Sequence, residues 1–436
     1  MVAQDSTLEK ERRDCADICR KLSKLEYDTD SWNELNRSIY EKIPLNCDVV
    51  IDDTTLREGV QMSGLRPPSP SEAAELAEDL SKIGVERLEV QIYSSAGKQA
   101  TKIMQDIGLG HRLAAWCRAA KSDIDEALRL DFEQVGISHP VSFIHFEKWP
   151  ERSLDELSSR VAESVSYAVE HGMTVFVHGE DSTRADWRFE KEFVNSVADS
   201  GAMTYRICDT VGVGLSSPKA GLPQGIPAKI KALNAETRIP YIEIHAHDDL
   251  GNAVENTMST VRTASEFNLD KIYVSTTFLG IGDRSGNAET EKIMMNCYLH
   301  HGLTKWNLSH LRGLARKVAD SLGYHLPLNK AIVGDSVFEH KSGIHQHGIS
   351  IFPVMYEVFP PELVGHTRRI VIGPGSGRHG IHLKTEQMLG RTVEEEDPRL
   401  DGLVALVREE LEKNLDSPEI ERDVFQQLMV KAGFKD

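Results

Sequence analysis

Two histidines at the end of an apolar run are the residues of this sequence best suited to chemistry. The stretch Tyr241–Asn252 reads YIEIHAHDDLGN, and His245 and His247 follow its alternating apolar residues. Side chains two residues apart on a strand point to the same face, so both imidazoles can project together from the strand's carboxyl end. Two neutral imidazoles on a rigid strand make half of a site for a divalent metal ion. The alternative is a packed polar pair.

A metal ion held by two imidazoles needs at least a third ligand. Glu58 is the best candidate in the sequence, and Asp53 and Asn287 are weaker ones. Two imidazoles, a carboxylate and an amide or water suit Zn, Mn, Co or Fe, and added oxygen ligands admit Mg. With an open position, such an ion acts as a Lewis acid on a carbonyl group, and a 2-oxo acid would chelate it.

Arg57 stands directly before Glu58, the expected carboxylate ligand. Its guanidinium could neutralise the negative charge that develops on a polarised carbonyl oxygen. The alternative is a simple ion pair with a nearby carboxylate.

Other apolar runs also end in polar and ionisable residues. A single residue of this kind is most often a solvated loop charge, but their recurrence at successive run ends indicates one shared rim. They are Gln61, Glu89, Gln91, Tyr93, His178, Glu180 and Thr210.

The rhythm of these runs predicts the element order. Eight short apolar, β-rich runs lie mostly about 30 residues apart, separated by helical patterns such as 69–84, 153–172 and 252–268. Eight strand–helix alternations favour an α/β fold of the (β/α)8 TIM-barrel type, whose chemistry sits at the carboxyl ends of the strands. The runs are 48–53, 87–92, 112–117, 132–138, 174–178, 204–208, 241–245 and 271–275.

We expect three regions along the chain. Residues 1–45 have helical spacing and form an N-terminal extension, residues 46–300 form the barrel, and residues 301–436 form a small C-terminal loop-and-helix subdomain. Within the last region, 306–323 predicts a helix, 328–380 is loop-rich, and 381–436 predicts three short helices.

The composition and net charge limit the classes of function that this protein can have. The 436 residues are 40% hydrophobic and 27% charged, with a net charge of -18, which disfavours nucleic acid and anionic membranes as partners. No apolar run approaches the roughly 20 residues that span a bilayer, and the charged N-terminus lacks a signal core, so we expect a cytoplasmic protein. Six scattered cysteines fit reduced thiols. Cys15 and Cys19 could serve a metal or redox pair, but a half-exposed helix face is favoured.

Seven ordered motifs resemble one family. They resemble the metal-dependent TIM-barrel acyl-CoA condensing and cleaving enzymes, which include isopropylmalate, homocitrate and citramalate synthases and hydroxymethylglutaryl-CoA lyase. The motifs at 338–348 and 373–380 point to the synthase branch. The motifs are DTTLREG (53–59), EDSTRAD (180–186), DTVG (209–212), HAHDDLGNAVEN (245–256), GIGDRSGNAETE (280–291), FEHKSGIHQHG (338–348) and GPGSGRHG (373–380).

The resemblance implies a role for each matching residue. Glu58, His245 and His247 match the metal ligands and Asn287 an additional ligand, while Arg57 matches the catalytic arginine. Thr210 matches a residue that binds the 2-oxo acid carboxylate, and Glu180 matches an active-site glutamate. His345 and Tyr356 match a His/Tyr pair that a neighbouring subunit contributes, which implies a homodimer with an exchanged C-terminal region.

The implied reaction is a Claisen-type condensation of acetyl-CoA with a 2-oxo acid, followed by thioester hydrolysis. It requires a divalent metal (Mg, Mn, Zn or Co) and a base, for which His345, assisted by Glu180 and Tyr356, is the expected group. Departures at His347, His178 and 91–93 lie near the expected 2-oxo acid pocket. They leave 2-oxoglutarate, 2-oxoisovalerate, pyruvate and a phosphonate analogue of oxaloacetate open as the substrate.

Two other functions remain as alternatives. The lyases of this family use a cysteine in a glycine-rich loop after the last strand, and the corresponding GIGDRSGN has none. A catalytically silent metal-binding barrel would be expected to lose Arg57, Glu180 or His345, and all three are present.

Overall fold

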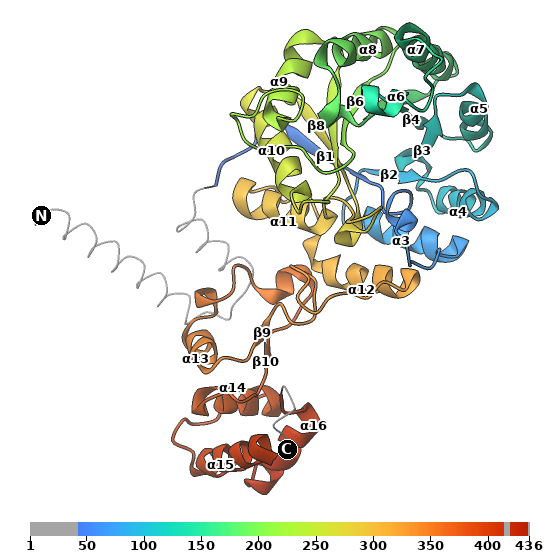
Figure 1. The fold of residues 1–436 in the computed structure, drawn as a ribbon. Helices are drawn as coiled ribbons and strands as arrows, with labels where there is room; N and C mark the ends of the chain where they lie inside the picture. The colour runs from blue at the N-terminus through green and yellow to red at the C-terminus, as the bar shows by residue number, and fades with distance from the viewer. Residues whose placement is uncertain (1–41, 414–418, 435–436) are drawn as a thin grey trace, which may run out of the picture. The chain divides into compact units, whose positions relative to one another are not determined.

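Eight parallel strands close into a barrel, as the sequence predicts. The computed structural model describes residues 42–413 and 419–434. The strands follow one another in chain order around the barrel, and β1 pairs with β8 to close it, as Figure 1 shows. They are β1 (Asp48–Asp53), β2 (Arg87–Val90), β3 (Leu113–Arg118), β4 (Gln134–Pro140), β5 (Thr174–Glu180), β6 (Thr204–Asp209), β7 (Tyr241–Ala246) and β8 (Lys271–Thr276).

A helix follows every strand and covers the outside of the barrel (Figure 1). Local capping explains where several begin: Ser69 and Ser153 each accept a hydrogen bond from the backbone of a glutamate three residues later, whose side chain accepts one in return. The helices are α3 (Pro70–Lys82), α4 (Ser95–Asp106), α5 (Lys121–Arg129), α7 (Leu154–Glu170), α8 (Trp187–Asp199), α9 (Ile226–Glu236), α10 (Ala253–Glu266) and α11 (Thr290–His301). A short additional helix, α6 (Phe143–Phe146), follows β4.

The interior of the barrel carries charge where an apolar filling is usual. We call Asp52, Arg87, Glu89, Arg206 and Glu243 the ionic core; each is at most 5% exposed. Arg87 Nη2 lies 2.6 Å from Glu243 Oε2, and Arg206 Nη1 lies 3.0 Å from Glu89 Oε2. Arg206 also pairs with Asp52, and because β6 and β1 are not neighbours in the sheet, that pair crosses the barrel. Carboxylates and guanidiniums thus pair with one another in the buried interior of the barrel.

The barrel unit extends further than the predicted boundary at residue 300. The compact unit spans Lys42–Leu326, and the remaining described residues from Pro327 on form another. The reason is α12 (Leu311–Leu322), whose apolar side, with Leu311, Leu314 and Val318 buried, packs against the barrel helix α3.

The second unit begins with a loop-rich part. This part contains α13 (Gly343–Ile351) and a parallel pair of two-residue strands, β9 (Glu339–His340) and β10 (Arg369–Ile370). The three predicted C-terminal helices are confirmed and share a core that includes Leu400, Leu403 and Phe425. They are α14 (Arg378–Leu389), α15 (Pro398–Lys413) and α16 (Arg422–Lys431).

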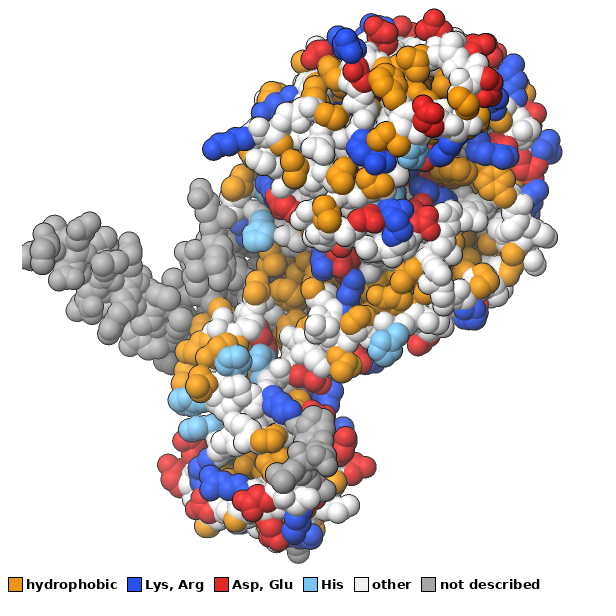
Figure 2. All heavy atoms as spheres, viewed as in Figure 1, with side chains coloured by type: hydrophobic (Ala, Val, Ile, Leu, Met, Phe, Trp, Pro, Cys, Tyr) orange, Lys and Arg blue, Asp and Glu red, His pale blue; other side chains and the backbone are white. Residues whose placement is uncertain are grey.

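The predicted N-terminal extension lies mostly outside the described residues, together with Cys15 and Cys19; residues 42–45 are not helical. None of the helices that the structure describes is long and apolar enough to cross a bilayer. Acidic and basic side chains are interspersed over the face of the barrel unit seen in Figure 2.

Candidate metal centre and active site

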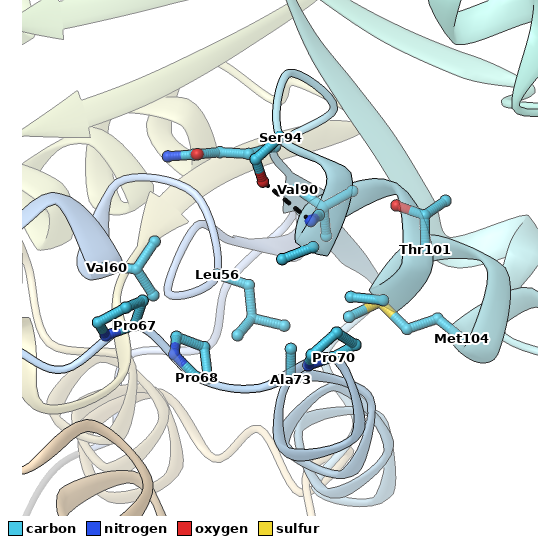
Figure 3. Close-up of a pocket in the computed structure, with 14 residues that line it drawn as sticks. Leu56, Val60, Pro67, Pro68, Pro70, Ala73, Val90, Ser94, Thr101 and Met104 are labelled. Atoms are coloured by element: carbon cyan, nitrogen blue, oxygen red, sulfur yellow. Dashed lines mark hydrogen bonds between the residues drawn. The ribbon is translucent and has the colours of Figure 1, made fainter.

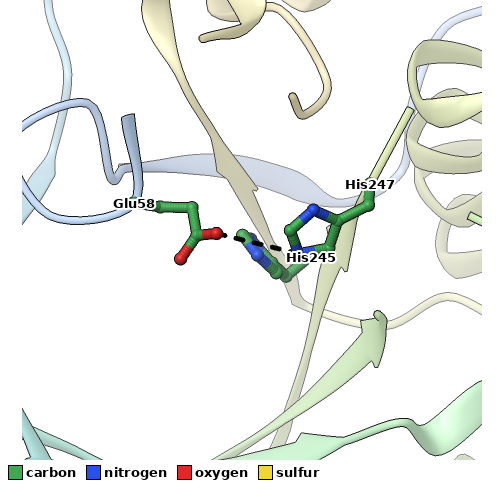
Figure 4. Close-up of side chains that lie close together, drawn as sticks. All are labelled: Glu58, His245 and His247. Carbon is green, nitrogen blue, oxygen red and sulfur yellow. Dashed lines mark ion pairs between the residues drawn. The ribbon is translucent and has the colours of Figure 1, made fainter. Parts of the chain in front are cut away.

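Glu58, His245 and His247 come together at the mouth of the barrel. Each offers a ligand atom within 4.8 Å of the others, and Figure 4 shows the carboxylate directed at the two rings. His247 Nε2 lies 3.9 Å from Glu58 Oε1. Two ligands about 2.1 Å from one ion lie roughly 3–4 Å apart, so this spacing suits a shared cation after a small adjustment.

Local structure explains this convergence. His245 follows Glu243 of the ionic core by two residues on β7, so both point into the barrel, and His247 continues the same face. Glu58 lies in a tight turn after β1, where the backbone N–H groups of Arg57 and Glu58 both donate to the carbonyl of Thr54. All three candidate ligands are at most 6% exposed.

Both histidines are held in the neutral form that ligates metals. Burial, with the neighbouring Arg284 as the next cause, lowers the pKa of His247 to about 4. Burial and the adjacent His247 lower the pKa of His245 well below its usual value. His245 Nδ1 lies 2.9 Å from Ser275 Oγ, which leaves its Nε2 for an ion.

Asn287, the predicted additional ligand, lies beside the two imidazoles. It forms a β-bridge with His247, and its Nδ2 lies 3.4 Å from His245 Nε2 and from His247 Nδ1. Its Oδ1 is buried without a hydrogen-bond partner. A Cβ at Gly282 would lie 2.2 Å from this oxygen, so the glycine makes room for it. The amide nitrogen faces the imidazoles, so Asn287 could offer this oxygen to an ion only after its side-chain amide turns over. The carboxylate of Glu58 and the two imidazoles fit a divalent cation without it.

Asp53, the other candidate ligand, has different partners. Its Oδ1 accepts from the backbone N–H of Thr55 and its Oδ2 from Thr290 Oγ1, both at 2.9 Å. It is not a member of the Glu58 group.

Arg57 is clamped between two carboxylates. Its Nε donates to Glu89 Oε1 at 2.5 Å, and its Nη1 pairs with Glu58. Glu89 is fully buried and also faces Arg206. Although burial raises the pKa of Glu89, Arg206 and Arg57 hold it well below the usual value, so Glu89 stays charged and orients Arg57. Both interpretations of Arg57 from the sequence are therefore compatible: it is an ion-pair partner and it lies beside the candidate metal ligands.

His178 lies against the same glutamate. Its Nε2 is 3.3 Å from Glu89 Oε2, and burial, with Arg206 as the next cause, lowers its pKa to about 4. Gly136 on β4 creates the space, because a Cβ there would lie 2.5 Å from His178 Nε2. His178 therefore helps to hold Glu89, which in turn orients Arg57.

The other residues predicted to bind the substrate are Gln91, Gln61, Tyr93 and Thr210. Gln91 Nε2 donates to the Arg57 carbonyl at 3.1 Å, and Gln61 is an exposed residue of a 3-10 turn at Gly59–Gln61. Tyr93 is 44% exposed and donates to Asp123 Oδ2 at 2.8 Å. Thr210 Oγ1 accepts from the backbone N–H of Asp181 at 2.8 Å, so in this structure it braces the turn that follows β5.

Glu180 ends β5 on the same inner face as His178. Two residues that the sequence analysis did not single out contact its Oε1: His145 Nδ1 at 2.9 Å and Lys148 Nζ at 3.4 Å. Ser275, Arg206 and these two residues were missed because each acts through another side chain. A Ser-x-x-His pattern after β4, in which Ser142 caps a short helix, was the one available signal.

His345 and Tyr356 belong to the second unit, where they contact each other. Their ring centroids lie 4.1 Å apart, with the ring planes 28° from parallel, and both side chains are exposed. His347 stacks in the same way on His379, with centroids 4.4 Å apart.

A separate cavity of about 190 Å³ lies between α3 and α4 (Figure 3). Its lining is mostly apolar and includes Leu56, Pro67, Pro70 and Met104. It shares Leu56 and Gln91 with the segments around Arg57, but its lining contains no titratable side chain. The candidate metal ligands and Arg57 lie instead at the mouth of the barrel.

Comparisons with known proteins show which family the chain resembles. The family described as HMGL-like matches residues 48–318, and the homocitrate synthase post-HMGL domain-like family matches residues 332–409. Homocitrate synthase 1 of Nostoc sp. is 36% identical over 78% of this chain and 87% of that protein. A (R)-citramalate synthase of Methanocaldococcus jannaschii is 34% identical over 78% of this chain and 67% of that protein.

One further relative and one solved structure are also similar to this chain. The 2-isopropylmalate synthase 2 of Caldanaerobacter subterraneus is 35% identical over 81% of this chain and 88% of that protein. The hydroxymethylglutaryl-CoA lyase structure from Pseudomonas aeruginosa covers 64% of this chain and 93% of its own, with a TM-score of 0.54 at 17% identity, a likeness of fold. The barrel, its motifs and these relatives together show that the chain belongs to the HMGL-like family.

Proposed function

We propose that this protein is a divalent-metal-dependent acyltransferase that condenses acetyl-CoA with a 2-oxo acid and hydrolyses the thioester. The relatives named homocitrate, citramalate and isopropylmalate synthase support this reaction class. The observation that carries the proposal is the grouping of Glu58, His245 and His247 beside Arg57. Magnesium, manganese, zinc or cobalt would suit this donor set, and acetyl-CoA is the co-substrate. The cytoplasm is the location that we propose for it.

The metal site, Arg57 and a base each have a role in the proposed condensation. When bound, the metal would supply Lewis-acid polarisation of the keto group. A methyl C–H bond of acetyl-CoA breaks, its proton passes to a base, and its electron pair forms the new C–C bond to the keto carbon. The keto oxygen takes up the displaced π electrons and a proton and becomes a hydroxyl, while Arg57 neutralises its developing charge. Water then cleaves the thioester and releases CoA as a free thiol.

The substrate pocket is proposed from the same neighbourhood. Thr210 holds the carboxylate of the 2-oxo acid, and Gln61, Gln91 and Tyr93 line the side that discriminates between acids. Glu89 and His178 contribute by holding Arg57. Candidate acids are 2-oxoglutarate, 2-oxoisovalerate, pyruvate and a phosphonate analogue of oxaloacetate.

The base is proposed to come from a second copy of the chain. His345, assisted by Glu180 and Tyr356, would accept the methyl proton. The region exchanged between the subunits of a homodimer would begin at Pro327, where the second unit starts, and not at residue 301. Exposed apolar side chains around the His345–Tyr356 pair support a covered face: Ile344 is 76% exposed and Val358 61% exposed. Apolar groups of this kind favour burial against a partner.

Cleavage in the lyase direction is less well supported. The second family match, over residues 332–409, is to a domain of homocitrate synthases. The loop after β8 has no cysteine.

Thiol release tests the proposal directly. The protein, loaded with each metal in turn, is mixed with acetyl-CoA and a panel of 2-oxo acids, and free CoA is measured. One acid that gives turnover far above the others is the expected result. No release with any acid and metal would contradict the synthase function.

A further inference from the structure

The ends of β4 and β5 are joined into one rigid edge beside Glu180. Pro140 is in register with Glu180, and the backbone N–H of Val141 donates to the Glu180 carbonyl at 2.9 Å. Directly after this pair the chain turns at Ser142, which caps α6. His145 lies in α6, which begins two residues after Val141. The hydrogen bond from Val141 to Glu180 therefore fixes the start of this helix next to Glu180.

His145 lies between two carboxylates. Its Nδ1 is 2.9 Å from Glu180 Oε1, and its Nε2 is 3.8 Å from Asp181 Oδ2. The imidazole is only 16% exposed and the Glu180 side chain 32% exposed. Lys148, one turn later, donates to the same Oε1 at 3.4 Å. Both basic groups therefore hold one oxygen of Glu180, and neither occupies Oε2.

The second carboxylate is itself fixed. Asp181 has a φ of 66°, in the left-handed region, and its backbone N–H donates to Thr210 Oγ1. Its side chain accepts from Arg184 Nε at 2.7 Å and from Ser142 Oγ. A strained residue held by this many contacts is a rigid support, so the imidazole has little freedom to leave Glu180.

We propose that His145 is a positioning residue that sets the Glu180 carboxylate for proton transfer, with Lys148 as a weaker second anchor. This inference rests on the proposed synthase function. In that reaction the methyl proton of acetyl-CoA leaves as the C–C bond forms, and the base must be aligned with the C–H bond. Holding Oε1 fixes the orientation in which Glu180 assists.

The test is a double-mutant cycle in the full-length protein. With acetyl-CoA and the responding 2-oxo acid, His145→Leu is expected to lower kcat by about 10- to 100-fold, with a nearly unchanged KM and metal content. His145→Asn, which returns a donor near the position of Nδ1, is expected to recover part of the loss. Adding His145→Leu to Glu180→Gln is expected to cost little more, since the two residues act as a unit.

His171→Leu is the matched control, because His171 is an exposed histidine that contacts the Tyr167 carbonyl, and it is expected to leave kcat unchanged. Native kcat in His145→Leu, equal losses in the Leu and Asn variants, or additive losses in the cycle would each overturn the positioning role. If His145→Leu does not fold, His145→Ala takes its place in the cycle, and native kcat in that variant would overturn the role. Absence of thiol release from the wild-type protein contradicts the synthase function itself, which distinguishes the two failures.

Discussion

The mouth of the barrel and the His345–Tyr356 region differ in how completely the chain builds them. At the mouth, Glu58, His245 and His247 are at most 6% exposed, and their neighbours fix their orientation. His345 and Tyr356 touch each other but are exposed among apolar side chains. A preorganised group of candidate ligands is therefore compatible with the proposal that a second copy of the chain supplies the proton acceptor.

Removal of a candidate ligand should have the largest effect. His245→Ala takes away one of two imidazoles and leaves too few donors to retain the ion, so both bound metal and turnover are expected to be lost. Metal content by elemental analysis and thiol release check this. Full activity in a metal-free His245→Ala protein would contradict the Lewis-acid role. It would also contradict the view that the mouth of the barrel is preorganised to bind a metal ion.

A mixing experiment tests whether the two regions work across subunits. Arg57→Ala is expected to keep its metal but to lose about 10²- to 10³-fold in kcat, since one charge-stabilising group is gone. His345→Ala is expected to lose activity as well. After subunit exchange in an equimolar mixture, about a quarter of the sites would be intact, because one site of each mixed dimer draws both residues from the unmutated copies. A mixture as inactive as its components would show that both residues act within one chain.

Loss of the Ser275 hydroxyl should weaken the metal without removing it. Ser275→Ala leaves His245 Nδ1 without its partner, and an expected decrease in metal affinity of about 10-fold follows. A competition titration with a chelator measures this change. Ser122→Ala, at an exposed serine on α5, is the control and should bind metal normally.

The smallest effect concerns acid stability. Burial lowers the pKa of His178 to about 4 in the folded protein, against about 6.5 in an unfolded chain, so the unfolded state binds more protons between these values. The free energy of unfolding should therefore fall as the pH decreases from 6.5 to 4, by up to about 1.4 kcal/mol per pH unit for this group. Urea unfolding of the wild-type protein and of His178→Asn should show a shallower dependence in the variant. Identical slopes would indicate that the pKa of His178 is not lowered in the folded protein.

Much of the barrel could be predicted from the sequence because its signals are local. Each of the eight strands is a short apolar run, and the His-x-His pattern marks the end of β7 by strand alternation alone. The ionic core could not be predicted, since Arg206 finds Asp52 only when barrel closure brings β6 opposite β1. His145 was missed for the same reason: its partner Glu180 follows 35 residues later in the next strand.

The compact barrel unit also ends later in the chain than the predicted boundary, for a physical reason. The helical pattern of 306–323 was recognised, but periodicity does not reveal the surface on which an apolar side packs. That α12 covers α3 depends on the return path of the chain after β8.

The ionic core limits which amino-acid substitutions such a barrel can accept during evolution. Its charges are shielded from solvent, so salt cannot screen them, and loss of one partner leaves the other uncompensated. Arg206 lies 3.0 Å from Glu243 Oε1 with both side chains fully buried. Single exchanges at either position should therefore be selected against, and related barrels are expected to keep or replace the two residues together, as a covarying pair.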